Sequence, residues 1–337
     1  MNIHVIITSI ANDQNIILKD IAKGCQTNNF NLIIVGDKKS PENFFIEGVK
    51  FISVEIQKKL RFDLIKKLPY NHYSRKNLGY LLAMRNEADV IIDTDDDNIP
   101  LQGFWKVNDD LIKCRVVNAT RWVNVYRYFS NEFIWPRGFP VELLKSEEPG
   151  EYENISEEVV KCPIQQGLAD ENPDVDAIYR LIGKLPINFD TGKSVALSNG
   201  SWCPFNSQNT VWHKDAFPLL YLPSYCSFRM TDIWRSYVAQ VIAYNYNWGI
   251  LFYSPTVYQE RNPHNLLQDF KDEVPGYLNN YKIVQELSGL NLKGQVSGIY
   301  DNLLILYRKL IELKVVGEEE LRLLESWIND LNYLNSR

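Results

Sequence analysis

The sequence predicts an α/β fold in which helices cover a parallel sheet, and three features near the N-terminus support this. Residues 3–9, 32–35 and 89–92 are short apolar runs rich in β-branched side chains, as in buried strands. Residues 16–25 and the segment from Ser74 onward place apolar side chains at helical spacing between those runs. Polar or glycine-containing turns close the strands. Because such alternation builds parallel sheets whose ligands bind beyond the carboxyl ends of the strands, we expect a site there.

The rest of the chain predicts long loops, further strands and a helical C-terminal part. Residues 126–190 are irregular and rich in Pro, Gly, Glu and aromatic side chains, which favours long loops over the sheet. Residues 231–244 have a helical pattern between two further strand patterns. From about residue 266 onward, leucines recur at helical spacing. We therefore expect a helical appendage after the sheet.

Composition and charge exclude several classes of protein. The chain has 36 basic and 42 acidic residues, and its net charge of -6 argues against binding to a nucleic-acid backbone. Five scattered cysteines without C-x-x-C spacing indicate reduced thiols rather than a disulfide framework or a zinc site. The N-terminus has no basic leader, and no stretch approaches the ~20 apolar residues of a membrane span. We expect no integral membrane segment and a location in the cytoplasm or peripherally at a membrane.

Four aspartates follow the strand predicted over residues 89–92. Asp93, Asp95, Asp96 and Asp97 place four carboxylates within five positions, and such a group repels itself unless a cation or hydrogen-bond donors compensate. Oxygen ligands suit Mg²⁺ or Mn²⁺, which take their remaining ligands from water and substrate phosphates. The cluster therefore predicts a divalent metal and a nucleotide diphosphate; the alternative is an acidic turn that caps the following segment.

Several motifs give the chain a resemblance to a known family. The strand followed by DDDNIP, with SRKNLGY opening the preceding helix, resembles the D-x-D region of GT-A glycosyltransferases. Four further stretches resemble the STELLO-like glycosyltransferase family, a relative of the plant reversibly glycosylated polypeptides: PIQQGL at 163–168, DENPDVDAIYRL at 170–181, NSQNT at 206–210 and TDIWR at 231–235. The resemblance covers about residues 1–270 and leaves the C-terminal residues outside. It implies a Rossmann-like mixed sheet of the GT-A type over residues 1–270 and a helical extension over 271–337.

The resemblance implies a metal site for Mn²⁺ or Mg²⁺. In GT-A enzymes the last aspartate of the motif binds the metal directly, and the first reaches the metal or the ribose, which corresponds to Asp97 and Asp95 here. Asp93 and Asp96 are lesser candidates, and Asp96 is expected beside the nucleotide. A second protein ligand is commonly a late histidine, and His264 matches by position. The alternative for His264 is a surface residue that caps a helix.

Cations or hydrogen-bond donors must also stabilise the diphosphate as it leaves. Arg75, Lys76 and Arg261 are the candidates. Arg75 and Lys76 open a helix, where backbone N–H groups and the helix dipole favour an anion. A solvated basic turn is the alternative for both residues.

Three residues near the first two strands occupy positions that, by the resemblance, hold the uracil and ribose. They are Thr8, Asn12 and Asp37. An ordinary turn after Gly36 is the alternative for Asp37. The expected donor is a UDP-sugar, because the resemblance favours uridine.

The acceptor side requires a general base and polar groups that recognise sugar hydroxyls. In an inverting transfer, a carboxylate at the start of a helix takes the proton of the acceptor hydroxyl, and Asp232 has such a position. The alternative is that Asp232 is the N-cap of its own helix. Hydroxyl recognition is expected from Asp174, Asp176, Asn206, Gln208 and Asn209. The expected acceptor is a glycan or a lipid-linked glycan.

Two other functions stay open. The related polypeptides include sugar-nucleotide mutases with a glycosylated arginine in a segment similar to residues 137–144, but Leu144 stands where that arginine is expected. Arg137, or a shifted alignment, could supply the missing arginine. A non-catalytic GT-A-fold interaction protein is the other alternative, since the STELLO-like family includes members thought to act on synthase complexes. A homodimer is compatible with each function.

Overall fold

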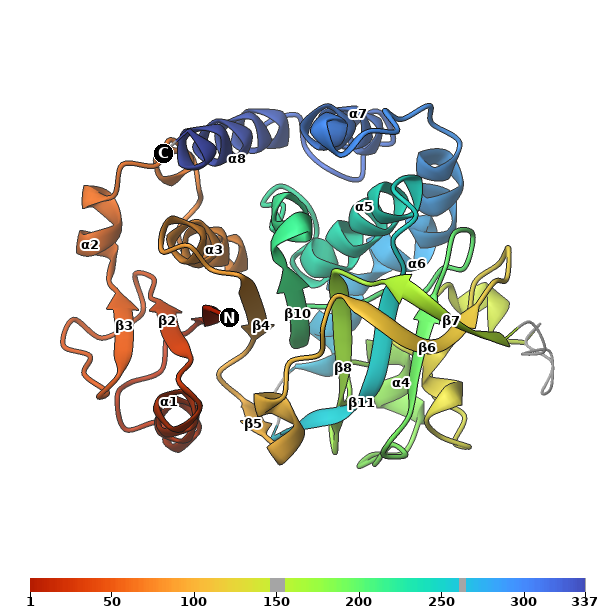
Figure 1. The fold of residues 1–337 in the computed structure, drawn as a ribbon, viewed down its shortest axis with the longest axis horizontal. Helices are drawn as coiled ribbons and strands as arrows, with labels where there is room; N and C mark the ends of the chain where they lie inside the picture. Colours follow the sequence, from red (N-terminus) through yellow and green to blue (C-terminus); the bar gives the residue numbers. More distant parts are fainter. Residues whose placement is uncertain (146–154, 261–264, 337) are drawn as a thin grey trace.

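A computed structural model describes residues 1–145, 155–260 and 265–336, and one mixed eleven-stranded sheet organises them (Figure 1). The strand order is β3-β2-β1-β4-β10-β8-β11-β9-β6-β7, with β5 paired to β11. The strands are β1 (Ile3–Thr8), β2 (Asn31–Val35), β3 (Val49–Ile52), β4 (Val90–Thr94), β5 (Asn98–Pro100), β6 (Leu111–Val117), β7 (Ile155–Lys161), β8 (Ile164–Asp170), β9 (Ser194–Leu197), β10 (Asn209–His213) and β11 (Ile250–Gln259).

The N-terminal half of the sheet is parallel, as the sequence predicts. β1 pairs in parallel with β2 and β4, and β2 pairs in parallel with β3. Because side chains alternate between the two faces of a strand, Ile6 and Ile33 belong to one hydrophobic core, while Val5 and Leu32 belong to another. Both faces of these strands are therefore buried, which explains their continuous apolar runs.

Helices cover both faces of this parallel half (Figure 1). The helix α1 packs on one face, and α3 packs on the other face together with helices from the second half of the chain. The α-helices are α1 (Ile16–Asn28), α2 (Val54–Lys59), α3 (Lys76–Arg85), α4 (Ala177–Ile182), α5 (Thr231–Asn245), α6 (Leu266–Ser288), α7 (Ile299–Glu312) and α8 (Glu320–Asn335). The predicted α/β fold, a mixed sheet flanked by helices with a helical C-terminal part, is confirmed.

Close packing of α3 against the sheet depends on Gly79. A Cβ atom at Gly79 would lie 2.5 Å from Cγ2 of Ile6 and 3.0 Å from Cγ2 of Val35. A larger residue here would push the helix away from β1 and β2. Since the turn that opens α3 carries Tyr73 and Arg75, Gly79 also fixes how close those residues come to the ends of the strands.

The region of residues 126–190 is more regular than the sequence indicates. Instead of long loops alone, it contributes the edge strand β7 and the central strand β8, which pairs with β10 and β11. Polar residues Gln165 and Gln166 lie within β8 and hide its strand pattern. Both are buried and hydrogen-bonded to backbone carbonyls, which is how the sheet accommodates them.

The C-terminal helices share the hydrophobic core of the sheet. Leu306 of α7 and Trp327 of α8 are fully buried in the same cluster as Leu78 of α3. The indole nitrogen of Trp327 donates to the carbonyl of Pro218 at 3.0 Å. In Figure 1, α7 and α8 lie above α5 and α3. Over the described ranges, every helix is too short or too polar to cross a bilayer.

Candidate functional site

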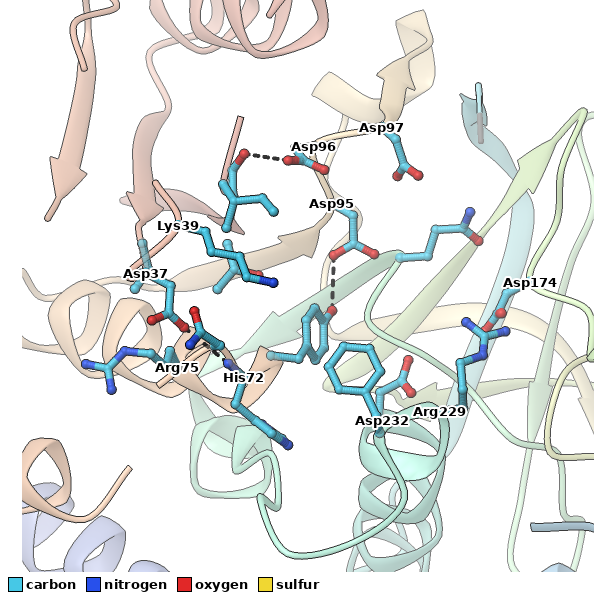
Figure 2. A pocket seen from close by; sticks show the side chains of 18 of the residues that line it. Asp37, Lys39, His72, Arg75, Asp95, Asp96, Asp97, Asp174, Arg229 and Asp232 are labelled. Atoms are coloured by element: carbon cyan, nitrogen blue, oxygen red, sulfur yellow. Dashed lines mark hydrogen bonds between the residues drawn. The ribbon is translucent and has the colours of Figure 1, made fainter. Parts of the chain in front are cut away.

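A cavity of about 490 Å³ opens where the first strands of the sheet end. Its lining includes the last residue of β1 (Thr8) and the residue after it (Ser9), the segment after β2, the turn after β4 and the start of α5. Figure 2 shows Asp37 and Lys39 on one side, with Asp174 and Arg229 on the opposite side. Convergence of strand ends from different parts of the chain is the arrangement expected of a ligand site in an α/β fold.

The turn after β4 presents three carboxylates to this cavity and hides a fourth. Asp95, Asp96 and Asp97 line the cavity, whereas Asp93 is fully buried inside the fold. The carboxylate of Asp93 lies 2.6 Å from Nζ of Lys76 and 3.2 Å from a guanidinium nitrogen of Arg235. Asp93 is thus an internal counter-ion, and its two cations lie behind the acidic turn.

Lys76 departs from its expected role in binding the nucleotide. Its side chain is fully buried beneath the turn, with Nζ 3.0 Å from Asp95 and 2.6 Å from the carbonyl oxygen of Thr94. It donates a hydrogen bond to the phenol of Tyr73 as well, at 3.1 Å. The sequence predicted a cation beside the diphosphate, but the ammonium group instead compensates the crowded aspartates from inside the protein.

Asp95 has a raised pKa in the cavity. Burial raises its pKa to about 7, Lys76 opposes this rise, and the neighbouring Asp97 and Asp93 add to it. Its Oδ1 accepts hydrogen bonds from Tyr73 and Lys76, both at 3.0 Å. A group of like charges that raises a carboxyl pKa in a cavity is suited to a cation, because a divalent ion would relieve the repulsion.

The other two aspartates of the turn are held by neutral donors. The hydroxyl of Ser9 donates to Asp96, and the amide of Gln259 donates to Oδ2 of Asp97 at 3.0 Å. Burial raises the pKa of Asp96. Since Ser9 follows β1 and Gln259 ends β11, the turn is fastened to strands on both of its sides.

The metal-binding potential of the turn rests on two carboxylates. Within the described ranges, no group of three or more His, Cys, Asp or Glu side chains is arranged to hold a metal ion. Asp95 and Asp97 both face the cavity, so an ion bound there would need water and substrate oxygens to complete its coordination. This donor set fits Mg²⁺ or Mn²⁺, which keep several non-protein ligands. His264 and Arg261 lie outside the described residues.

The side of the cavity nearest β1 and β2 carries two of the expected nucleotide contacts. Thr8 and Asp37 line it, and Oδ2 of Asp37 accepts a hydrogen bond from the backbone amide of His72 at 3.1 Å. Lys39 also lines this side, and its ammonium points into the cavity (Figure 2). Asn12 is different: it is exposed outside the cavity lining, and its side chain accepts from the amide of Gln14.

Arg75 borders the cavity, but its guanidinium serves the fold. Nε donates to Oε1 of Gln57 at 2.9 Å, and Nη1 donates to the carbonyls of Leu68 and Pro69, each at 3.3 Å. The guanidinium also stacks over Tyr70, 4.4 Å from the ring centre. These contacts hold the segment before α3, so Arg75 departs from the role of direct diphosphate contact.

The far side of the cavity is built around Asp232, Asp174 and Arg137. Asp232 lies in the first turn of α5, but the N-cap is Met230, so the alternative of Asp232 as the N-cap is wrong. Arg137 donates to both oxygens of Asp232 at 3.0 Å and to both oxygens of Asp174 at 2.8 and 2.9 Å. Burial raises the pKa of Asp232, but the charge and hydrogen bonds of Arg137 outweigh it and leave the pKa below its usual value.

The remaining predicted hydroxyl-binding residues have different environments. Gln208 lines the cavity, while Asn206 lies behind it and donates to Asp174 at 2.8 Å. Asp176 is fully buried as the N-cap of α4 and accepts from the indole of Trp135 at 2.7 Å. Asn209 is buried in β10 and donates to Thr256 at 2.7 Å. Asp176 and Asn209 are therefore structural and depart from the expected sugar contacts.

Several cavity residues had no clear signal in the sequence. Tyr73, Phe228 and Arg229 line the cavity, and the ring of Phe228 packs edge-on against His72 and Tyr73. Phe228 is 54% exposed at the cavity, where its ring can pack against the apolar face of a ligand. Aromatic residues are common in loops before helices, so the sequence does not single out Phe228. Only its place in the cavity wall indicates a role in binding.

Comparison with known proteins connects the chain to glycosyltransferases. A family model described as STELLO glycosyltransferases matches residues 229–337. The curated proteins "Probable glycosyltransferase STELLO2" and "Probable glycosyltransferase STELLO1" of Arabidopsis thaliana are each 28% identical to the chain over 323 residues. Each match covers 90% of this chain and 41% of the relative, so the chain spans less than half the length of these relatives.

Two solved structures have a low similarity to the chain. "Crystal Structure of a Mycobacterial Protein" has a TM-score of 0.40 at 10% identity and covers 83% of this chain and 74% of its own. "Mannosyltransferase PcManGT from Pyrobaculum calidifontis in complex with GDP-Man and Mn2+" has a TM-score of 0.34 at 7% identity. This match covers 98% of the present chain and 87% of the mannosyltransferase chain.

The resemblance to STELLO-like glycosyltransferases that the sequence motifs indicate is confirmed. Its expected extent is wrong, however, because the family model reaches residue 337 and includes the C-terminal helices. The matched C-terminal helices α7 and α8 share one hydrophobic core with the sheet.

Proposed function

We propose that this chain is a glycosyltransferase domain that transfers a sugar from a nucleotide-diphosphate donor to a hydroxyl acceptor. One observation carries the proposal: a single cavity has the acidic turn of Asp95 and Asp97 on one part of its wall and the buried, ionised Asp232 on another. The first group suits a metal and a diphosphate, and the second suits a hydroxyl that must lose its proton. Similarity to the STELLO proteins supports the same class of reaction.

The donor nucleotide would occupy the side of the cavity formed by the ends of β1 and β2. Thr8 and Asp37 offer hydrogen-bonding groups for a ribose or base, and Lys39 offers an exposed cation for a phosphate. UDP is the proposed nucleotide, on the strength of the family resemblance. Arg75 supports this side indirectly, because it holds the segment that carries His72, whose amide binds Asp37.

Asp95 and Asp97 would hold Mn²⁺ or Mg²⁺, with water and diphosphate oxygens as the other ligands. Such an ion would supply charge stabilisation for the departing nucleotide diphosphate. The protein's own contribution is to keep two carboxylates at the cavity surface, fastened by Tyr73 and Gln259. Lys76 limits their repulsion from behind without occupying the cavity.

Asp232 is the proposed general base. Its pKa is held below the usual carboxyl value by Arg137, so it is ionised at neutral pH and can accept a proton from the acceptor hydroxyl. Asp174 and Gln208 lie on the cavity wall, where they can accept or donate hydrogen bonds to sugar hydroxyls. With Asp232 as the base, the proposed reaction is an inverting transfer, and the proposed acceptor is a glycan or a lipid-linked glycan.

The mutase alternative is weaker in this geometry. A self-glycosylated arginine must present a free, nucleophilic nitrogen, but Arg137 binds two carboxylates, and their charges raise its pKa well above the ordinary value against the opposing effect of burial. Leu144 has no nucleophile. A non-catalytic interaction protein would have no need of an ionised carboxylate inside a cavity beside an acidic turn.

Release of nucleotide from a panel of UDP- and GDP-sugars, with Mn²⁺ and glycan acceptors present to receive the sugar, tests the proposal. We expect Asp232→Asn to bind the donor as the unmodified protein does but to release nucleotide on the order of 100-fold more slowly. Asp20→Asn, on the exposed face of α1, is the matched control and should change neither property. If Asp232→Asn releases nucleotide at the wild-type rate, Asp232 is not the base. If the wild-type protein turns over none of the donors, the proposal that the chain is a glycosyltransferase is contradicted.

A further inference from the structure

Arg137 is the most completely bonded side chain of the cavity. Its five N–H groups meet five acceptors: both oxygens of Asp174, both oxygens of Asp232 and the backbone carbonyl of Arg229. A guanidinium has five donors, so none is left over for a ligand. Arg137 itself is only 6% exposed. It lies between the two carboxylates and joins residues that are far apart in the chain.

The backbone around Arg137 is fixed as firmly as its side chain. Its amide donates to the carbonyl of Asp174 at 2.9 Å. The following Gly138 has a φ of +94°, and its carbonyl accepts from Tyr237 of α5 at 2.6 Å and Asn280 of α6 at 2.9 Å. A Cβ at Gly138 would lie 2.5 Å from Ile233, so this loop needs glycine. The guanidinium is therefore held in place before any ligand arrives.

Other groups around Asp232 complete its environment. The backbone amide of Ser207 donates to Oδ2 of Asp232 at 3.2 Å, and the guanidinium of Arg235 adds positive charge from α5. Tyr73 and Cys226 approach from other elements and are neutral at physiological pH, because burial raises the pKa of each. Arg137 is thus the one cation that binds Asp232 directly among the described residues.

We propose that Arg137 is a positioning residue that presents Asp174 and Asp232 as a preformed pair of carboxylates to one polyhydroxylated acceptor. Both carboxylates bind the same nitrogen, Nη2, so they are held side by side. Asp232 accepts the proton of the attacking hydroxyl, and Asp174 accepts a hydrogen bond from a second hydroxyl of the same sugar. This assignment rests on the proposed function and names a ligand with two neighbouring hydroxyls as the acceptor class.

Arg137→Met tests the proposal. Arg137→Lys is the variant that keeps the positive charge but loses the bidentate N–H groups of the guanidinium. Without a cation, the two buried carboxylates should take up protons, so Arg137→Met should melt at a higher temperature at pH 5 than at pH 8. The double variant R137M/D232N should lose most of that difference. Arg115→Met, at an exposed position of β6, is the control. If R137M has the same pH dependence of melting as this control, the positioning role is overturned.

The rate of nucleotide release provides the second readout. We expect R137M to release nucleotide on the order of 100-fold more slowly, with the acid limb of its pH profile at higher pH, and R137K to recover part of the rate. Affinity for UDP with Mn²⁺ should stay within about twofold, because the acidic turn does not touch Arg137. An unchanged pH profile would overturn the proposal. If the unmodified protein binds no nucleotide, the proposed function fails, while the melting curves still decide the role of Arg137.

Discussion

Glu320, the first residue of α8, connects the C-terminal helices to the cavity. It is fully buried, and its carboxylate accepts from the backbone amides of Ser224 and Tyr225, at 2.9 and 2.6 Å, and from the hydroxyl of Tyr221. These three residues lead directly into the turn of Phe228 and Arg229 at the cavity wall. We expect that Glu320→Ala destabilises the protein and loosens this wall at the same time.

The magnitude follows from the bonds that are lost. Hydrogen bonds to a charged group contribute about 1.5–3 kcal/mol each, and the buried donors left unsatisfied add to the loss. Tyr225 is exposed, so its backbone amide can regain water. Removal of a buried carboxylate also relieves its desolvation, so the expected loss is smaller than the sum of the bonds. The expected loss in the free energy of unfolding is about 3 kcal/mol, with a loss of nucleotide affinity beside it.

Urea unfolding of Glu320→Ala against Glu325→Ala measures this loss. Glu325 is exposed on the same helix, so its replacement should change the free energy of unfolding by less than about 0.5 kcal/mol. Glu320→Gln, which keeps one acceptor oxygen, should fall between the two. Equal stability of the Glu320→Ala and Glu325→Ala proteins would refute the claim that this carboxylate holds the wall of the cavity.

Two further changes test the roles assigned to single residues. Burial raises the pKa of Asp176 to about 6, above an unfolded value of about 3.9, so its stabilising contribution is complete below the unfolded pKa and is lost as pH rises through 6. Asp176→Asn should therefore reduce the fall in unfolding free energy between pH 4 and 7.5 by roughly 2–3 kcal/mol, and an unchanged slope in urea titrations would contradict this. Lys39→Ala should weaken UDP binding about tenfold at low salt and less at high salt. Lys23→Ala, at an exposed position, is the control. Equal UDP affinity of the two variants in calorimetry would show that Lys39 does not contact the nucleotide.

Features of the fold and the cavity that depend on local sequence patterns were predictable from the sequence. Strands and helices alternate within short windows, and the ends of parallel strands must meet at one edge of a sheet. This is why Thr8, Asp37 and Asp95 could be expected in one place before the fold was known. The position of Asp232 follows similarly from the start of its helix.

Contacts between residues that are far apart in the sequence were not predictable. Arg137 meets Asp232 across 95 positions of sequence, and no local pattern distinguishes it from other loop arginines. Asp174 and Asp176 are two residues apart in one motif, yet one faces the cavity and the other caps a buried helix. Lys76 begins its helix as predicted, but only the fold shows that its side chain turns inward to the aspartates.

The most direct test of the central claim is calorimetric titration of the protein with UDP, GDP and CMP, each with and without Mn²⁺. We expect UDP to bind when the metal is present. Asp97→Ala should abolish this binding, while Asp20→Ala, on the exposed face of α1, should not. Binding of no nucleotide under any metal condition, or equal binding by the Asp97→Ala protein, would contradict the donor site and favour a protein that acts through interaction alone.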